Sequence, residues 1–586
     1  MKLVNRIIYQ ELKPYYGWFI LTIGLIFLTV GFEALNPWPF KALIDNVLGN
    51  EVVNNATLSG KIISLFSSRE SLGYFVALVY FLTILLGSLA EYFRAVSAKK
   101  LSNAVVKSFS QKVFSNLEYF TLANYQKKKI GDYIYHLSYD VPALGSFIEA
   151  GLLPFITNVL YLIMTSIILV VISPRLFYIV LPMIPIIAIG VLLFNKKIDR
   201  ATNKAERSNS MLIAFIEEAL NQLKNIHAFN REDSTSETFT ENETNAINDS
   251  LNTHGWTTLL DALVGVVIAI GYGTIVVYGI RAVFSGQLTI GLLVIFFFYL
   301  DNITNPLTSL MTSVGVLREN YVKVAEVAEL LNPDYLILDT GQLTELKVED
   351  IHFKNVSTHD EGNNPILDQA TFTIPAGKRT VILGASGSGK TTIASLIMRF
   401  IEPSDGTVSI GENNLGDYSM KSLRNAIAYV PQELSLFNDS IKNNILFGNP
   451  DATLPELTEA TELATADDFI MKVPNNYEFR VGTEGINLSG GQRQRILLAR
   501  AFLKTQAKIM IFDEPLSALD IKNRATLLKK LEPVIKGKTT IIISNILEVA
   551  DWADYIVMIN HGKVVHTGSS KALHEKEHLI DLLLSS

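Results

Sequence analysis

The sequence of 586 residues contains no cysteine. The absence of thiols excludes disulfides, thiolate metal sites and a cysteine nucleophile, and it leaves the redox compartment undefined. An excess of positive charge is also missing, because 50 lysines and arginines against 57 aspartates and glutamates give a formal net charge of −7. Nucleic-acid binding depends on a basic surface that neutralises phosphates, so we expect no nucleic-acid partner.

Charged residues of both signs are scarce. They make up 18% of the chain, against about 25% in typical soluble domains. Hydrophobic residues make up 49%, and the mean hydropathy is +0.28. This balance indicates a membrane protein. The chain is also too long for one ordinary globular core, so we expect more than one domain.

Six stretches are apolar and long enough for membrane helices, which need roughly 20 residues to cross a hydrocarbon core of about 30 Å. They lie at about 18–35, 73–90, 152–172, 176–194, 259–280 and 288–300. Only the turn Ser173-Pro174-Arg175 separates the third stretch from the fourth, so these two form a hairpin. Buried helices of a soluble protein would explain one such stretch but not six. The sequence therefore predicts an all-α transmembrane domain of six helices.

The connections between these stretches alternate between short and long, and the long ones are basic. The connection after the second stretch carries Arg94 and Lys127 to Lys129, and the one after the fourth begins with Lys196 and Lys197. Basic connections stay in the cytoplasm. We therefore expect a multi-pass membrane protein with both termini in the cytoplasm, and we expect the membrane to be a bacterial inner membrane. Both long connections keep apolar residues at helical spacing, so they are expected to be long cytoplasmic helical extensions of the spans.

The composition changes after the sixth stretch. A helical continuation ends at Asn332-Pro333-Asp334, and from about Leu346 short β-rich runs alternate with helical patterns, as in an α/β domain. We predict a transmembrane domain at 1–330, a linker at 331–345 and an α/β domain at 346–586.

The α/β domain contains a glycine-rich loop between a strand-like run at 379–383 and a helical pattern. This setting is that of a Walker A loop, in which backbone N–H groups and a helix N-terminus bind phosphate. Lys390 is expected to reach the β- and γ-phosphates of ATP, and the Thr391 hydroxyl to ligate Mg²⁺. The predicted nucleotide-binding residues of this P-loop NTPase fold are Gly384, Ala385, Ser386, Gly387, Ser388, Gly389, Lys390, Thr391 and Thr392.

A second motif follows the apolar strand at 509–512. Asp513 would ligate Mg²⁺ and Glu514 would polarise the attacking water, as in a Walker B element. An acidic pair after a strand is usually a solvated loop. Its position downstream of the Walker A loop favours the functional interpretation.

Between the Walker motifs lies the segment Leu488-Ser489-Gly490-Gly491-Gln492, followed by a helix. With this segment the chain resembles the ATP-binding cassette (ABC) family. Gln432 lies where that family has its Q-loop, and Ser517-Ala518-Leu519-Asp520 matches its D-loop. The membrane half resembles the six-helix exporter type, and the segment around Asp132 and Asp140 is similar to its first coupling segment.

The resemblance implies a transport ATPase that acts as a dimer. Two cassettes would close head to tail, so that ATP lies between the Walker motifs of one subunit and the LSGGQ segment of the other. Ser489, Gly490, Gly491, Gln492 and Asp520 would then contact nucleotide, and Gln432 would serve both Mg²⁺ binding and catalysis. The cargo would be a hydrophobic or amphipathic drug, lipid or peptide, reached from the surrounding membrane lipid.

Two positions depart from the family pattern. Asn545 stands in place of the switch histidine, and asparagine donates hydrogen bonds but carries no proton at neutral pH. The adenine-stacking loop has no aromatic residue, and His359 is its only ring, which would weaken stacking by about 1 kcal/mol. Two alternatives follow: a homodimer with slow turnover, or a heterodimer in which this chain has the impaired ATP site.

The membrane half does not identify the cargo. Glu33 and Asp301 lie in or at the ends of apolar stretches, where acids are costly and are functional candidates by default. Both lie near the ends of predicted spans, so contact with cargo and a simple interfacial position are equally supported. The leading hypothesis is ATP-driven export. The alternative is a nucleotide-binding regulatory subunit of a membrane assembly without transport of its own.

Overall fold

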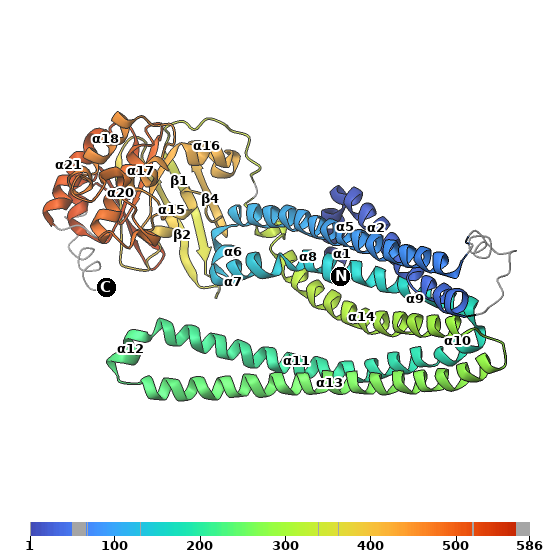
Figure 1. Ribbon diagram of the computed structural model, residues 1–586. Helices are drawn as coiled ribbons and strands as arrows, with labels where there is room; N and C mark the ends of the chain where they lie inside the picture. Colours follow the sequence, from blue (N-terminus) through green and yellow to red (C-terminus); the bar gives the residue numbers. More distant parts are fainter. Residues whose placement is uncertain are drawn as a thin grey trace. The chain divides into compact units, whose positions relative to one another are not determined.

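A computed structural model describes residues 2–49, 66, 68–128, 130–337, 339–360, 362–517 and 521–569. The chain divides into two compact units (Figure 1). The helical unit comprises Met1–Glu118 and Lys129–Asn332, and the α/β unit comprises Tyr119–Lys128 and Pro333–Ser586.

The α/β unit includes a short segment that we had expected in the membrane domain. Phe120 forms a β-bridge with Leu336. The N–H of Ile337 donates to the carbonyl of Tyr119 at 2.8 Å, and the N–H of Thr121 donates to the carbonyl of Tyr335 at 2.9 Å. These backbone hydrogen bonds attach the segment at 119–128 to the start of the α/β unit.

Long helices dominate the helical unit. They are α2 (Tyr16–Leu35), α5 (Arg69–Glu118), α9 (Leu153–Ile172), α11 (Met183–Asn221), α13 (Glu232–Phe284) and α14 (Ile290–Glu329). The shorter α-helices are α1 (Lys2–Leu12), α3 (Trp38–Ala42), α7 (Ile130–Tyr135), α8 (Ala143–Ser146), α10 (Pro174–Val180) and α12 (Leu223–Ala228). A 3₁₀ turn, η1 (Lys13–Tyr15), and the π-helical segments η2 (Leu43–Leu48), η3 (His136–Asp140) and η4 (Phe147–Leu152) join them.

Within the described residues, six helical stretches are long and apolar enough to cross a membrane. They are Val4–Leu48, Arg69–Glu118, Ile130–Ile172, Pro174–Asn221, Glu232–Phe284 and Ile290–Glu329. Each contains all or nearly all of one predicted apolar stretch, which confirms the six-helix fold class. Their lengths of 40 to 53 residues correspond to about 60–80 Å at 1.5 Å per residue. The helices therefore extend well beyond a hydrocarbon core of about 30 Å.

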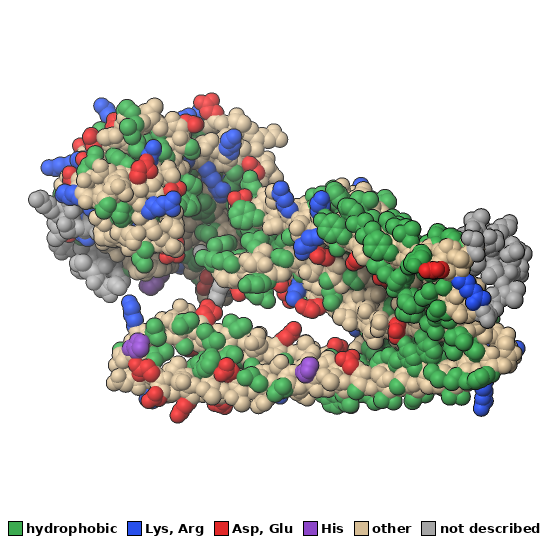
Figure 2. Space-filling view, viewed as in Figure 1, with side chains coloured by type: hydrophobic (Ala, Val, Ile, Leu, Met, Phe, Trp, Pro, Cys, Tyr) green, Lys and Arg blue, Asp and Glu red, His purple; other side chains and the backbone are tan. Residues whose placement is uncertain are grey.

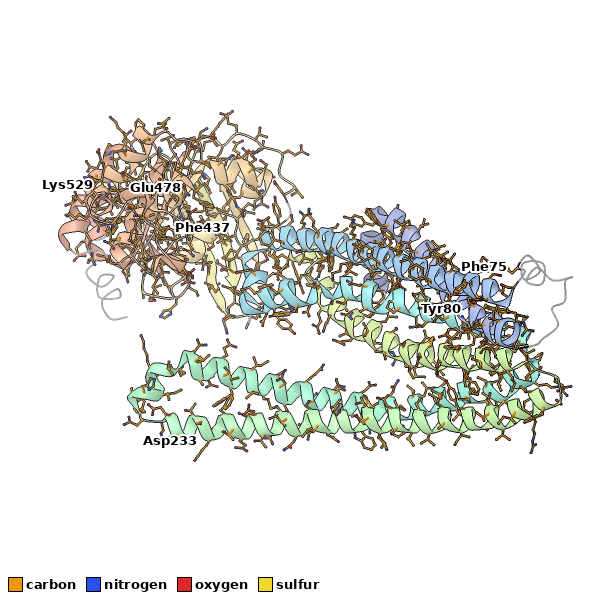
Figure 3. The ribbon with its side chains drawn as sticks, viewed as in Figure 1. Phe75, Tyr80, Asp233, Phe437, Glu478 and Lys529 are labelled. Atoms are coloured by element: carbon orange, nitrogen blue, oxygen red, sulfur yellow. The ribbon has the colours of Figure 1, made fainter. Side chains whose placement is uncertain are left out.

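Apolar packing and apolar exposure both occur in the helical unit. In Figure 1, α11 and α13 run side by side, and α12 joins them at one end. Tyr80 of α5, labelled in Figure 3, lies edge-on to Phe40 of α3 with ring centroids 5.0 Å apart. Large apolar side chains are nevertheless exposed on the outer helix faces, such as Val171 at 76%, and hydrophobic side chains cover much of the surface along α2 and α5 (Figure 2). Such surfaces are expected where helices face lipid.

Within its described residues, the α/β unit contains two sheets. The first is antiparallel with the order β2-β1-β4-β5, and the second has the order β10-β9-β3-β8-β7-β6. In the second sheet β9, β3, β8, β7 and β6 are parallel and β10 is antiparallel to β9. The strands are β1 (Ile351–His359), β2 (Pro365–Ile374), β3 (Arg379–Leu383), β4 (Asp405–Ile410), β5 (Asn413–Asn414), β6 (Ile427–Val430), β7 (Ile509–Asp513), β8 (Thr539–Ser544), β9 (Tyr555–Asn560) and β10 (Lys563–Gly568).

Helices accompany the parallel sheet, and its central strands are buried throughout. Every residue of β7 and β8 is buried, as expected for parallel strands covered on both faces. The helices of this unit are α6 (Leu122–Gln126), α15 (Lys390–Ile397), α16 (Met420–Asn425), α17 (Ile441–Leu446), α18 (Leu454–Leu463), α19 (Asp467–Ile470), α20 (Gly490–Phe502) and α21 (Ile521–Ile535). Ligands of such sheets bind at the carboxyl ends of the strands.

Candidate nucleotide site

The carboxyl ends of three neighbouring strands bring the predicted catalytic residues to one edge of the sheet. Strand β8 lies between β3 and β7, with Leu383 opposite Ser544 and Asp513 opposite Ile543. Glu514 comes directly after β7, and its N–H donates to the carbonyl of Ile543 at 3.0 Å. Asn545 follows β8 and is exposed. It therefore emerges between the Walker A loop and Glu514.

The loop after β3 has the backbone of a phosphate-binding loop. Gly387 and Gly389 have φ angles of +78° and +98°, and Gly389 is the N-cap of α15. A Cβ at Gly389 would lie 2.8 Å from the carbonyl oxygen of Ile366. Only glycine meets both the conformation and the close approach. The hydroxyl of Ser388 is buried in the same loop and has no hydrogen-bond partner among the described residues.

Lys390 folds back over this loop. Its Nζ donates to the carbonyls of Gly384 and Ala385 at 2.8 and 2.6 Å. Burial lowers the pKa of the Lys390 ammonium, and the nearby Glu514 and Asp513 carboxylates act in the opposite direction. The Lys390 ammonium is bonded to neutral carbonyl oxygens. A phosphate anion would be a stronger hydrogen-bond partner for it.

A carboxylate and a hydroxyl suited to Mg²⁺ lie side by side. The Thr391 hydroxyl donates to Asp513 Oδ1 at 3.3 Å. Asp513 Oδ2 is buried and has no hydrogen-bond partner among the described residues, and burial raises the pKa of the Asp513 carboxyl to about 6. Oxygen donors of this kind are the ligands that Mg²⁺ prefers, so these two residues fit the ion. Gln432 follows β6, the neighbour of β7, and its side chain is exposed.

Gln494 contacts the backbone of Glu514, which the sequence analysis did not predict. Its side chain is buried on α20, and its Nε2 donates to the carbonyl of Glu514 at 3.1 Å. The Ser517 hydroxyl donates to the same carbonyl at 3.0 Å. Glu514 has a φ of +49°, an uncommon conformation for a residue with a side chain. The two hydrogen bonds hold this backbone in place. The rest of the predicted D-loop, including Asp520, lies outside the described residues.

The LSGGQ segment forms a capped helix start. Ser489 is the N-cap of α20, where its hydroxyl accepts from the N–H of Gln492 at 3.3 Å and its own N–H donates to Gln492 Oε1 at 2.8 Å. This capping box orients the positive end of the helix dipole, with Gly490 and Gly491 in the first turn. The LSGGQ segment thus has its capped helix start within a single chain, with the Ser489 side chain exposed.

His359 and the Walker A helix line one cavity. The cavity has a volume of about 880 Å³ and includes Thr391, Thr392 and Ser395 in its wall. His359 ends β1 and is exposed, and its Nδ1 lies 3.3 Å from the Ser404 hydroxyl. None of the described residues in the wall belongs to the LSGGQ segment. The wall does not include Lys390, Asp513 or Glu514, so only the part beside His359, Thr391 and Thr392 borders the predicted nucleotide site, with the base expected at His359.

Replacing His359 by tyrosine is expected to tighten ATP binding by about 1 kcal/mol, or roughly fivefold, because a larger ring stacks better on adenine. The measurement is the dissociation constant of ATP for the purified chain in EDTA, where hydrolysis does not interfere. His359→Ala is the matched comparison. Equal affinity of the tyrosine and alanine variants would show that this position does not contact adenine.

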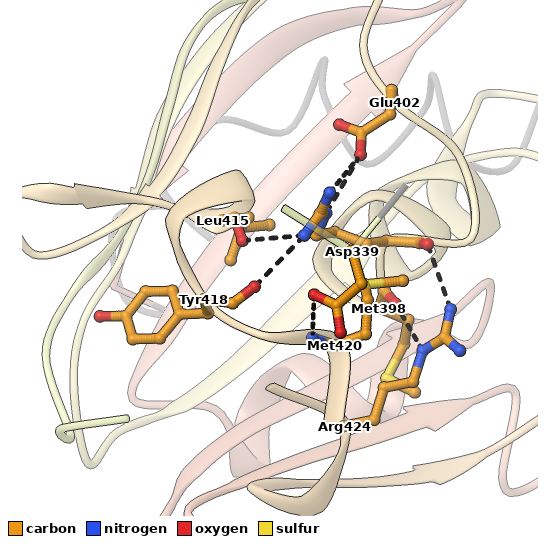
Figure 4. Close-up of polar contacts among 8 residues, drawn as sticks. Asp339, Met398, Glu402, Leu415, Tyr418, Met420 and Arg424 are labelled. Carbon is orange, nitrogen blue, oxygen red and sulfur yellow. Dashed lines mark hydrogen bonds and ion pairs between the residues drawn. The ribbon is translucent and has the colours of Figure 1, made fainter. Parts of the chain in front are cut away.

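Two arginines fix the far end of the Walker A helix (Figure 4). The buried Arg399 donates to Glu402 at 3.0 Å and to the carbonyls of Leu415 and Tyr418 at 3.4 Å. Arg424 donates to the carbonyl of Arg399 at 3.3 Å. These buried and partly buried hydrogen bonds hold the segment that follows the C-terminal end of α15, opposite its phosphate-binding end.

Comparison with known proteins agrees with this geometry. The family profile described as "ABC transporter transmembrane region" matches residues 19–307. The profile described as "ABC transporter" matches residues 367–517. Together they cover roughly three quarters of the chain.

Curated relatives are similar along their whole length. The "Putative multidrug export ATP-binding/permease protein YgaD" of Bacillus subtilis (strain 168) is 28% identical over 573 residues, which cover 97% of this chain and 96% of that protein. A protein of Staphylococcus aureus (strain NCTC 8325 / PS 47) with the same description is 29% identical over 579 residues, 98% of each chain. The solved structure of a bacterial Atm1-family ABC exporter with ATP bound has a TM-score of 0.82 at 23% identity and covers 97% of this chain and 98% of its own. It shows the same fold.

Proposed function

Since the chain belongs to the ABC transporter family and joins the transmembrane region of that family to its ATP-hydrolysing domain, we propose that it exports a hydrophobic or amphipathic cargo by alternating access. The observation that carries this proposal is the single sheet edge at which the Walker A loop and Lys390 follow β3, while Asp513 ends β7 and Glu514 comes directly after it, with β8 between the two strands. The relatives described as multidrug exporters support the direction of transport.

We assign the chemical roles from the geometry of that edge. Lys390 and the loop amides bind the phosphates of ATP. Thr391 and Asp513 hold Mg²⁺, which supplies charge neutralisation between the β- and γ-phosphates. Glu514, held through its backbone by Gln494, polarises the water that attacks the γ-phosphate. The predicted roles of Gln432 and Asp520 remain part of this proposal.

The proposed active form is a dimer. In one chain Ser489, at the capped start of α20, is exposed. A second cassette would bring its Ser489 and the following amides to the γ-phosphate, which completes the site and makes closure depend on ATP. Hydrolysis would then release the two cassettes.

We further propose that this chain contributes the slower ATP site of an unequal pair. Asn545 emerges between the phosphate loop and Glu514, where an asparagine binds phosphate but cannot carry a proton. The intact LSGGQ segment of this chain would complete the faster ATP site of a different partner subunit.

Transport in proteoliposomes tests the function. With ATP and Mg²⁺ on the cassette side, we expect concentrative movement of a labelled hydrophobic cargo, and we expect this flux to be lost in Glu514→Gln. A regulatory subunit would bind ATP and alter its assembly without such flux. The chain should be reconstituted with whatever subunit co-purifies from its native membrane.

The unequal pair has a separate test. The chain purified alone should hydrolyse ATP slowly. Brisk hydrolysis by the isolated chain, abolished by Glu514→Gln, would contradict the heterodimer and leave the homodimer.

A further inference from the structure

A polar cavity lies inside the helical unit, apart from the nucleotide site. Its volume is about 340 Å³, and side chains of α2, α5, α9 and α14 line it. These four helices belong to four of the six apolar stretches. The wall nevertheless carries charged and amide side chains, among them Glu33, Glu91, Arg94, Asn158, Tyr161 and Asn305.

The cavity lies near the middle of the membrane-crossing region. Tyr161 precedes the Ser173 turn by about 12 residues, or about 18 Å along the helix. Asn305 lies about 15 residues, or about 22 Å, after the start of α14. Glu33 is exposed, but it lies well before the end of its stretch, because α2 is continued by α3 and η2 up to Leu48. The sequence analysis had left this residue at the end of a span.

The cavity wall carries one more carboxylate than it has cationic side chains. The Arg94 guanidinium donates hydrogen bonds to both carboxylate oxygens of Glu91, at 2.6 and 2.5 Å. The formal charges of this ion pair cancel. Tyr161 and Glu33 line the same cavity, and the Tyr161 hydroxyl lies close enough to interact with the Glu33 carboxylate. Arg94 also interacts electrostatically with Glu33, but within the described part of the chain its ion pair is with Glu91. Two carboxylates and one guanidinium leave the cavity with a formal charge of −1.

A carboxylate in excess of the cationic side chains is costly among apolar helices and calls for a cationic partner. We propose that this cavity binds the positive charge of the cargo, a monovalent organic cation, at Glu33. The Tyr161 hydroxyl orients the carboxylate, and the amides of Asn158 and Asn305 offer polar contacts to the cation or its water. This inference rests on the proposed export function, since it names the charge class of the cargo.

The chain offers a matched control. Asp301 of α14 is also a carboxylate close to a tyrosine hydroxyl, that of Tyr272, but it does not line the cavity. Asp301→Asn and Glu33→Gln therefore remove the same charge from similar surroundings, and only the second changes the proposed site.

The test uses the full chain in lipid nanodiscs without nucleotide, with equilibrium dialysis corrected for empty discs. The probes are tetraphenylphosphonium and its anionic isostere tetraphenylborate. We expect the unchanged chain to prefer the cation. Glu33→Gln should weaken cation binding at least tenfold, Tyr161→Phe should weaken it less, and Asp301→Asn should change it less than twofold.

Equal binding of the two probes by the unchanged chain would overturn the proposal, whatever the variants do. It would also fail if Glu33→Gln, with ATP affinity and gel-filtration profile unchanged, bound the cation normally or lost both probes alike. Because binding is measured without ATP, a chain that binds the cation at Glu33 but shows no flux would contradict the export function and leave this site intact.

Discussion

Replacing Asp513 by asparagine is expected to abolish Mg²⁺-dependent ATP hydrolysis and, at the same time, to stabilise the nucleotide-free protein at pH 8. Asp513 is buried. Among the described residues its Oδ2 has no hydrogen-bond partner, and its Oδ1 accepts a hydrogen bond from the Thr391 hydroxyl at 3.3 Å. Asparagine removes the charge with little change in shape. It also removes the anionic oxygen that the metal needs.

The direction of the stability change follows from the pKa. Burial raises the pKa of Asp513 from 3.8 to about 6, so the folded protein favours the protonated acid. Its contribution to stability is full below pH 3.8 and is lost as the pH rises through 6. Two pH units correspond to about 3 kcal/mol as an upper limit for the cost of the ionised form at pH 8.

Thermal unfolding in EDTA at pH 8 and pH 5 is the measurement. Asp513→Asn should raise the unfolding midpoint at pH 8 and raise it less at pH 5, and Mg²⁺ with ATP should stabilise the unchanged chain more than the variant. Glu514→Gln serves as the control, since it also stops hydrolysis but alters a less buried carboxylate. A lower midpoint for Asp513→Asn than for the unchanged chain at pH 8 would contradict the prediction.

Local patterns were sufficient to predict the elements around the nucleotide site. The glycines before Lys390 follow an apolar strand, and a strand–loop–helix unit is determined by residues close in sequence. The structure adds which strands are neighbours. That Asn545 emerges between Gly384 and Glu514 depends on β8 lying between β3 and β7, and no local pattern determines strand order.

Other features were missed because their partners are distant in sequence. Gln494 looks like one more polar residue of an obvious helix, and its burial against the backbone of Glu514 follows only from how α20 packs. Hydropathy marks only the apolar part of each helix, and the helical extensions follow from the spacing of apolar residues in the basic connections. The apolar stretch at 73–90 ends where polar residues begin, whereas helix α5 continues to Glu118.

The polar cavity of the helical unit could not be predicted either. Glu33 and Tyr161 each lie in an apolar stretch, whereas Glu91 and Asn305 follow the ends of two others, and the four residues are separated by up to about 270 positions. A lone polar residue on a membrane helix is compatible with an interface, a helix contact or a cavity. Only the packing of four helices shows that these residues surround one space.

Replacing Asn545 by histidine is expected to raise the ATP turnover of the isolated chain about 100-fold. A side chain that exchanges protons contributes roughly 10²–10⁴ to such reactions, and an imidazole titrates near neutral pH while an amide does not. The position follows β8 at the sheet edge that holds Glu514, so the new ring would lie between the phosphate loop and the polarised water. Phosphate release by the purified chain is the measurement.

Two further variants separate chemistry from packing at Asn545. Asn545→Gln enlarges the side chain without adding a titrating group, and it should leave turnover near the original rate. Asn545→His combined with Glu514→Gln should also remain slow, because the histidine acts only when the water is polarised. The gain in Asn545→His should fall as the pH drops below about 6.5, where imidazole becomes fully protonated. Equal turnover of the histidine and glutamine variants would mean that Asn545 does not limit this site, and the argument for an unequal pair would lose its basis.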